Sequence, residues 1–111
     1  MPVVPEDGEE TARWVRITGE VQGVWYRGWT CEEAVRRGLN GWVRNRKDGS
    51  VEALFAGPAY TVMEMVAACR NGPPAANVRY IESEIAEIPD LIGFEQRPTA
   101  CFKRRTGLQT S

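Results

Sequence analysis

The stretch that most constrains the fold is a strand that leads through a glycine-bearing turn into a helix. Alternating residues predict the strand over 14–18, Gly19 and Gly23 mark the turn, and the helix is expected to begin near Tyr26. Such a connection directs several backbone N–H groups and the positive end of the helix dipole at one point. Arg27 adds a permanent positive charge there. The stretch therefore predicts a binding site for a phosphate-like anion.

The rest of the chain completes a β-α-β-β-α-β order. Helices are predicted over 26–37 and between Pro58 and Asn71, and strands over 41–45, 51–56, 78–88 and 93–97. Gly49 is expected to supply the positive φ of a hairpin turn, Gly57-Pro58 to end the third strand, and a bulge to interrupt the fourth. This order predicts an α+β, ferredoxin-like split βαβ sandwich, with an antiparallel sheet, both helices on one face and a short closing strand.

Helical spacing predicts which side chains of the two helices are buried. The expected stripes are Tyr26, Thr30 and Ala34 in the first helix, and Val62, Met65, Val66 and Cys69 in the second. Glu32–Arg36 and Glu33–Arg37 are spaced to pair on a solvated face, and Trp42 is expected in the core. One domain is predicted over 13–97, between a flexible acidic tail at 1–12 and a polar, basic tail at 98–111.

Composition excludes several kinds of chemistry. The chain of 111 residues has no histidine, which excludes imidazole acid–base catalysis and histidine metal sites. Its net charge of −1 argues against a protein that coats nucleic acid, because such proteins usually carry a surplus of basic residues. The three cysteines are widely spaced and match no metal-binding or redox motif. The sequence also shows no cluster of carboxylates that could bind a metal ion. Without a secretion signal or a membrane-spanning apolar run, the protein is expected to be cytoplasmic.

Several residues near the predicted anion site have an ordinary explanation beside a functional one. Asn45 ends a strand just before the hairpin, where asparagine is a common turn residue, and Asp48 is most simply a turn residue too. Trp25 and Tyr26 fit a core or rim position as well as a substrate platform. Cys31 is best explained by packing, because no base is available to activate it.

Two long motifs together resemble the acylphosphatase family. Gly19-Glu20-Val21-Gln22-Gly23-Val24-Trp25-Tyr26-Arg27 is similar to its first signature, and Gly41-Trp42-Val43-Arg44-Asn45 followed by Asp48-Gly49-Ser50-Val51-Glu52 is similar to its second. The resemblance spans roughly 13–97 and implies the same ferredoxin-like sandwich. It also implies that Arg27 binds a phosphoryl group and that Asn45 positions the attacking water. Arg46 stands where many relatives have a small hydroxyl residue, which could add positive charge near the mouth of the site.

The resemblance implies a hydrolase that cleaves acyl phosphates. Its expected substrate-binding residues, acting through the backbone turn, are Gln22, Gly23, Val24, Trp25 and Tyr26. We expect no cofactor, no metal and no nucleic-acid or membrane partner. The protein is expected to be a monomer whose only partner is a small acyl phosphate substrate. One alternative is a non-catalytic domain that binds an anion or a carbamoyl-phosphate-like ligand. A remote alternative is an RNA-binding module, which shares the β-α-β-β-α-β order but displays aromatic side chains on its sheet.

Overall fold

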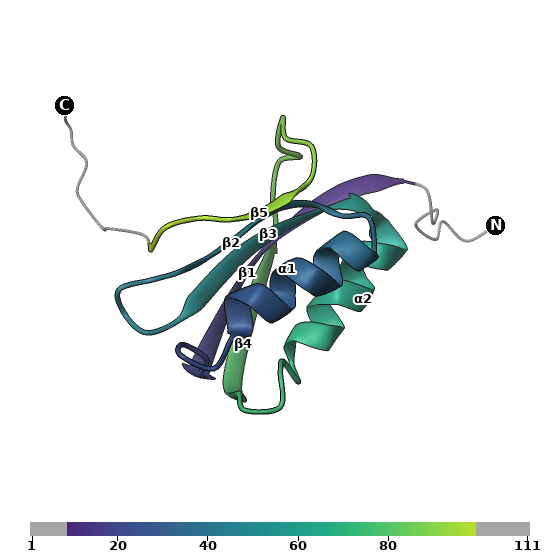
Figure 1. The fold of residues 1–111 in the computed structure, drawn as a ribbon. Coiled ribbons are helices and arrows are strands. Elements are labelled where there is room, and N and C mark those ends of the chain that lie inside the picture. The colour runs from purple at the N-terminus through teal and green to yellow at the C-terminus, as the bar shows by residue number, and fades with distance from the viewer. Residues whose placement is uncertain (1–8, 100–111) are drawn as a thin grey trace.

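The structure, a computed structural model, describes residues 9–99; the tail segments 1–8 and 100–111 lie outside the described residues. The elements are β1 (Glu10–Glu20), α1 (Tyr26–Arg36), β2 (Asn40–Asn45), β3 (Val51–Pro58), α2 (Ala59–Cys69), β4 (Asn77–Ile85) and β5 (Phe94–Gln96). The strands form one sheet in the order β4-β1-β3-β2-β5. Both helices cover the same face of this sheet (Figure 1). The predicted β-α-β-β-α-β sandwich is confirmed.

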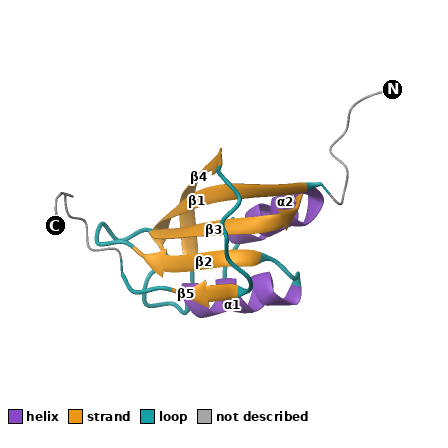
Figure 2. Ribbon diagram, turned by 90° about the horizontal axis from the view of Figure 1, so that it is seen from above, coloured by secondary structure: helices purple, strands orange, loops and turns teal. Residues whose placement is uncertain are grey.

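The sheet is mixed rather than purely antiparallel. Strands β1 to β4 pair antiparallel, but β5 pairs in parallel with β2, with Val43 opposite Gln96. Because β4 and β5 lie at opposite edges, the chain that joins them crosses the sheet face away from the helices (Figure 2). The expectation of an antiparallel sheet is therefore correct for the first four strands only.

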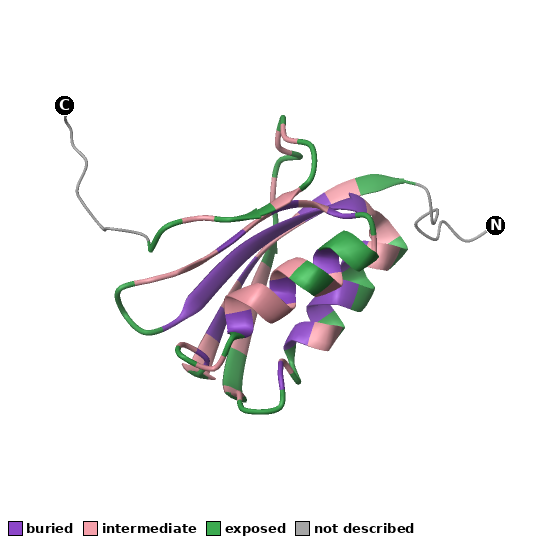
Figure 3. Cartoon of the chain, viewed as in Figure 1, coloured by how far each residue is buried: buried purple, intermediate pink, exposed green. Residues whose placement is uncertain are grey.

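The core lies between the helices and the sheet (Figure 3). Both predicted helix stripes are buried: Tyr26, Thr30 and Ala34 on α1, and Val62, Met65, Val66 and Cys69 on α2. The sheet contributes alternate residues, including Val15, Ile17, Val43, Ala53 and Phe55, each with no exposed surface. Burial of these apolar side chains supplies the main driving force for folding.

The opposite face of the sheet is organised around a carboxylate. Glu52 is only 5% exposed, and it accepts hydrogen bonds from Trp14 Nε1 and Arg44 Nε, both at 2.7 Å. Trp42 lies on this face as well, with the guanidinium carbons of Arg44 and Arg97 at 4.7 Å and 5.2 Å from its ring centroid. Trp42 is partly buried and packs against a smaller apolar cluster of Ala12, Leu54 and Ala56 on this face. The predicted core position is therefore correct for this second cluster and not for the core beneath the helices, because side chains alternate along β2 and its neighbours face the helices.

Strand β1 begins earlier than predicted, and β3 ends later. The two strands pair over Glu10↔Pro58, Thr11↔Gly57 and Ala12↔Ala56. Residues 10–12 therefore belong to the sheet and not to a tail, and Gly57-Pro58 does not interrupt β3. Pro58 is tolerated because it is the last residue of its strand, where a missing N–H removes little from the ladder.

The predicted bulge in β4 is confirmed where this strand pairs with β1. Thr18 pairs with Tyr80 and Gly19 with Val78, so Arg79 is the extra residue. The register between the two strands shifts at Thr18 and Gly19, and β4 ends at Ile85, before the expected Ile88. Gly19 has φ 138°, and a Cβ atom placed on it would lie 2.3 Å from the carbonyl oxygen of Asn77. Glycine thus lets the two backbones approach closely just before the turn that leads to α1.

Helix α1 carries one of its two predicted ion pairs. Arg37 Nη1 lies 2.6 Å from Glu33 Oε1, and Arg36 contacts the same carboxylate. The predicted Glu32–Arg36 pair is therefore wrong. Glu33 and Arg37 are also only about one-fifth exposed, at 20% and 19%, and so are less solvated than expected. The two arginines hold the pKa of Glu33 below its usual value through hydrogen bonds and charge.

Candidate active site

The turn between β1 and α1 has an unusual backbone. Gly23 has φ 76°, and Trp25 has φ 68° and ψ 25°, the one positive φ at a non-glycine position among residues 9–99. A left-handed conformation costs a bulky residue about 1–2 kcal/mol. Strained residues persist only where the surrounding structure holds them, and they are common at functional sites. The strained backbone of Trp25 therefore makes this turn a candidate functional site.

The first turn of α1 has backbone donors to offer a ligand. Trp25 precedes the helix without a side-chain cap, and the first turn contains no acidic residue. The leading N–H groups of a helix have no acceptor within the helix, and the dipole makes this end positive. Arg27 lies in the same turn, and within residues 9–99 no ion pair or hydrogen bond engages its guanidinium. Donors and a free positive charge therefore meet at this point.

The side-chain amide of Gln22 links this turn to the hairpin between β2 and β3 through hydrogen bonds. Gln22 Nε2 donates to the carbonyl oxygens of Arg46 (2.7 Å) and Ser50 (2.8 Å). Asp48 closes the hairpin by accepting from Ser50 N (2.9 Å) and Ser50 Oγ (2.6 Å), which confirms it as a turn residue. These hydrogen bonds hold the pKa of Asp48 below its usual value. Gly49 has φ 96°, as predicted.

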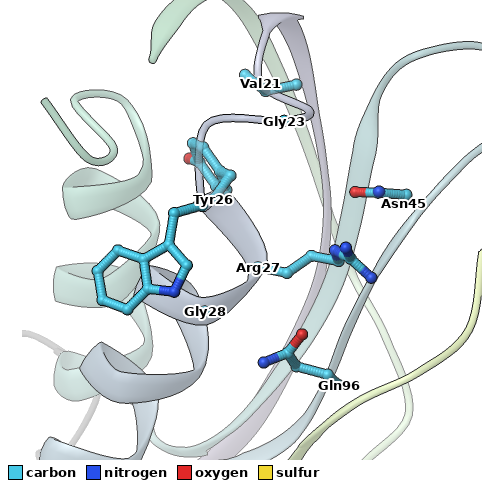
Figure 4. A pocket seen from close by; sticks show the side chains of 8 residues that line it. Val21, Gly23, Tyr26, Arg27, Gly28, Asn45 and Gln96 are labelled. Atoms are coloured by element: carbon cyan, nitrogen blue, oxygen red, sulfur yellow. The ribbon is translucent and has the colours of Figure 1, made fainter. Parts of the chain in front are cut away.

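A pocket of about 130 Å³ opens where the turn, α1, β2 and β5 meet. Its lining residues are Val21, Gly23, Trp25, Tyr26, Arg27, Gly28, Asn45 and Gln96. Figure 4 shows the Arg27 side chain extending from the helix toward the strands, between the carboxamides of Asn45 and Gln96. The structure thus brings Arg27 and Asn45, which the sequence places in separate segments, to the same pocket.

The other predicted binding residues contribute in different ways. Gly23, Trp25 and Tyr26 line the pocket, whereas Gln22 is engaged with the hairpin and Val24 packs against the core. The phenol of Tyr26 is buried: its hydroxyl donates to the carbonyl oxygen of Cys69 (2.5 Å), and burial raises its pKa. Any contact of Gln22 and Val24 with substrate would be made by backbone N–H groups, and it stays a prediction.

Sequence reasoning missed Gln96, along with Val21 and Gly28. Gln96 lies two residues after Phe94, whose ring stacks on Phe55 on the helix-covered side of the sheet, with 5.6 Å between centroids. Alternation therefore places Gln96 on this same side. It pairs with Val43, two residues before Asn45. The alternation was visible in the sequence, but the parallel pairing of β5 with β2 was not.

Among the described residues, 9–99, Arg27 is the only one with a charged side chain that lines the pocket. Arg46 adds none, because its guanidinium lies on the opposite face of the sheet, with Nη1 3.4 Å from Glu52 and Nε 3.5 Å from Asp48. The unusual residue next to Asn45 is thus part of the network around Glu52. A single positive charge beside free N–H groups favours one small anion.

The cysteines within the described range are poor nucleophiles. Burial raises the pKa of Cys31 and raises the pKa of Cys69 to about 12, so both stay protonated at neutral pH. Across residues 9–99 no three His, Cys, Asp or Glu side chains gather where they could hold a metal ion. In the same range no helix has the length and apolar character needed to cross a membrane.

Fold and site together define a ferredoxin-like α+β protein with a small pocket, in which the guanidinium of Arg27 lies beside the neutral amide side chains of Asn45 and Gln96. Residues 14–96 match the family model described as Acylphosphatase. The chain is 58% identical over 85 residues to an acylphosphatase of Rhodospirillum rubrum, covering 77% of this chain and 93% of the relative. It is 53% identical over 93 residues to one of Rhizorhabdus wittichii, covering 82% and 92%. The chain belongs to the acylphosphatase family.

Solved structures agree with this assignment. An acylphosphatase from Coxiella burnetii superimposes with a TM-score of 0.77 at 33% identity, covering 79% of this chain and 93% of that one. Full-length HypF in its phosphate- and nucleotide-bound form superimposes with a TM-score of 0.76 at 22% identity over 12% of its length, which shows a shared fold alone. The protein is thus an acylphosphatase, a hydrolase whose substrates are acyl phosphates.

Proposed function

We propose that the chain cleaves acyl phosphates by direct attack of a water molecule that Asn45 orients. Arg27 and the backbone N–H groups of residues 22–27 hold the phosphoryl group. The observation that supports this most is that Arg27 and Asn45 line one pocket although they come from a helix and from a strand. The pocket has a cation and an amide in its lining, and its volume of about 130 Å³ can hold a phosphoryl group and a water molecule.

The reaction does not need a general acid. Cleavage of the P–O bond of an acyl phosphate releases a carboxylate, whose conjugate acid has a pKa of about 4. The leaving oxygen therefore departs unprotonated at neutral pH. This suits a pocket whose lining, as far as residues 9–99 form it, contains neither a histidine nor a carboxyl group.

The proposed step is R–CO–O–PO₃²⁻ + H₂O → R–COO⁻ + H₂PO₄⁻. A bond forms between the water oxygen and phosphorus, and the bond from phosphorus to the acyl oxygen breaks. The carboxamide oxygen of Asn45 accepts a hydrogen bond from the water but is too weak a base to remove its proton. A phosphoryl oxygen of the substrate takes that proton, and no covalent phosphoenzyme forms.

Charge on the phosphoryl group is neutralised by the chain itself. Negative charge spreads over three equatorial oxygens in the transition state of phosphoryl transfer. The guanidinium of Arg27 presents donors in a planar fork that suits two of these oxygens, and the uncapped N–H groups at the start of α1 suit the third. The positioned donors would thus act without a metal ion.

Hydrolysis of benzoyl phosphate by the wild type and by Arg27→Ala tests the proposal. We expect the variant to lose about 10²-fold or more in kcat/KM with an unchanged circular dichroism spectrum. The matched control is Arg70→Ala, which removes an exposed arginine outside the pocket lining. Near-full activity of Arg27→Ala would remove Arg27 from the mechanism, and loss of wild-type activity in a chelator would defeat the metal-free scheme. Phosphate binding without turnover would favour the non-catalytic alternative.

A further inference from the structure

We infer that Gln96 and Trp25 form the binding site for the acyl half of the substrate, and that this site favours a flat aromatic acyl group. Gln96 binds the acyl carbonyl oxygen, and the indole of Trp25 supports the group attached to it. The inference rests on the proposed function, because it takes the phosphoryl group to lie beside Arg27.

The size of the pocket places the acyl group at its mouth. Pockets that enclose a drug-sized ligand have volumes of roughly 300–1,000 Å³, whereas this one has about 130 Å³. It therefore encloses the phosphoryl group and the attacking water, and the acyl group extends over the rim. Trp25 is exposed and Gln96 is exposed, so both side chains belong to that rim.

Trp25 has a ring face available to a ligand. It is 59% exposed, whereas the other three tryptophans are more deeply buried. Trp14 donates to Glu52, and Trp29 packs edge-to-face with Tyr26, with 5.4 Å between ring centroids. Their rings have structural partners, whereas the Trp25 ring stands beside the pocket with much of its surface in solvent.

Gly28 gives the Trp25 ring its place. A Cβ atom at position 28 would lie 2.1 Å from Trp25 Nε1, so the indole rests directly on bare backbone at the start of α1. The left-handed backbone of Trp25 carries the ring to this position. A flat ring held beside the phosphate site offers an apolar surface on which another flat ring can stack.

Gln96 has the complementary polar role. Its carboxamide lies on the other side of the Arg27 guanidinium from Asn45 in Figure 4, and within residues 9–99 it has no hydrogen-bond partner. The acyl carbonyl is bonded through one oxygen to phosphorus, so it must lie close to the phosphoryl group. The amide N–H of Gln96 can donate to this carbonyl oxygen.

The two roles predict different substrate dependence. The carbonyl is common to every acyl phosphate, whereas only an aromatic acyl group gains from a ring platform. The test therefore measures kcat/KM for benzoyl phosphate and for acetyl phosphate with each variant. Comparing the ratio of the two values between variants cancels the intrinsic reactivity of the substrates.

Trp25→Asn removes the ring while retaining a residue that tolerates a left-handed backbone. We expect its benzoyl-to-acetyl ratio to fall roughly tenfold, and Trp25→Phe to restore most of it. Gly28→Ala, which displaces the ring without deleting it, should lower the ratio in the same direction. Tyr60→Asn, at an exposed aromatic on α2 outside the pocket lining, is the control and should leave the ratio unchanged.

Gln96→Leu removes the amide at similar size, and we expect it to lower kcat/KM for both substrates by a similar factor of roughly ten. An unchanged ratio in Trp25→Asn and Gly28→Ala would overturn the role of Trp25, and undiminished activity of Gln96→Leu would overturn that of Gln96. Either result leaves the proposed function standing if the wild type hydrolyses both substrates. Failure of the wild type on both would overturn the proposed function and this inference with it.

Discussion

The side-chain amide of Gln22 donates to the backbone carbonyl of Arg46, the residue that follows Asn45 (2.7 Å). The same nitrogen reaches the carbonyl oxygen of Ser50, across the hairpin (2.8 Å). These two hydrogen bonds join the turn that precedes α1 to the hairpin that ends β2. The distance between Arg27 and Asn45 therefore depends on a side chain that is not among the residues lining the pocket.

Replacing Gln22 with Met keeps the length of the side chain but removes its donors. We expect kcat for benzoyl phosphate to fall about tenfold, because Asn45 is less firmly placed. The free energy of unfolding should fall by about 1–3 kcal/mol, because two hydrogen bonds are lost. Both carbonyl oxygens keep one backbone donor, Gly49 N for Arg46 and Arg46 N for Ser50. The inhibition constant of inorganic phosphate should change little. If phosphate affinity falls as much as kcat, Gln22 acts in anion binding and not in spacing.

Asn45→Ala should separate water positioning from phosphate binding. Without the carboxamide the attacking water is no longer oriented, and we expect kcat to fall about 10²-fold. Inhibition by inorganic phosphate should remain within a few-fold of the wild type, because Arg27 and the N–H groups are intact. A collapse of phosphate affinity would instead identify Asn45 as a binding group.

Tyr26→Phe removes a buried hydrogen bond between the start of α1 and the end of α2. We expect the free energy of unfolding to fall by about 1 kcal/mol, which lowers Tm by about 4–8 °C for a domain of this size. Burial raises the pKa of Tyr26 above its unfolded value of about 10. The stability it contributes is therefore present below pH 10 and is lost as the pH rises further. Denaturant unfolding of both proteins between pH 8 and 11 should show a smaller alkaline loss in the variant.

Glu52→Gln tests the buried carboxylate on the sheet face away from the helices. Burial alone would raise the pKa of Glu52, but the donors Trp14 and Arg44 and the charges of Arg44 and Arg46 outweigh it and lower the pKa. A lowered pKa contributes stability above the unfolded value of about 4.3 that is lost as the pH falls through the folded value. We expect the variant to be less stable at pH 7 and to approach the wild type below pH 4. A stability difference that is constant from pH 7 to pH 3 would contradict this.

Much of the fold could be predicted because its signals are local. Helical spacing identified every buried residue of both helix stripes, and the glycine in the hairpin was identified by its turn. Two expectations depended on choices that local spacing leaves open. Arg36 can reach either Glu32 or Glu33 within α1, and it contacts Glu33. Trp42 lies on the sheet face away from the helices, and only the pairing of the strands decides which apolar cluster it joins.

The candidate site divides in the same way. The turn after β1 and the arginine at the start of α1 are adjacent in the chain, so the sequence by itself determined that backbone N–H groups and a positive charge lie close together there, from which an anion site is predicted. Three features were decided by the tertiary structure: the position of Asn45 in the pocket, the hydrogen bonds from Gln22 to the hairpin that follows Asn45, and the position of Gln96 at the rim. The physical reason is that each depends on strand register or on a side chain reaching a distant backbone carbonyl. Such long-range pairings leave no local pattern in the sequence.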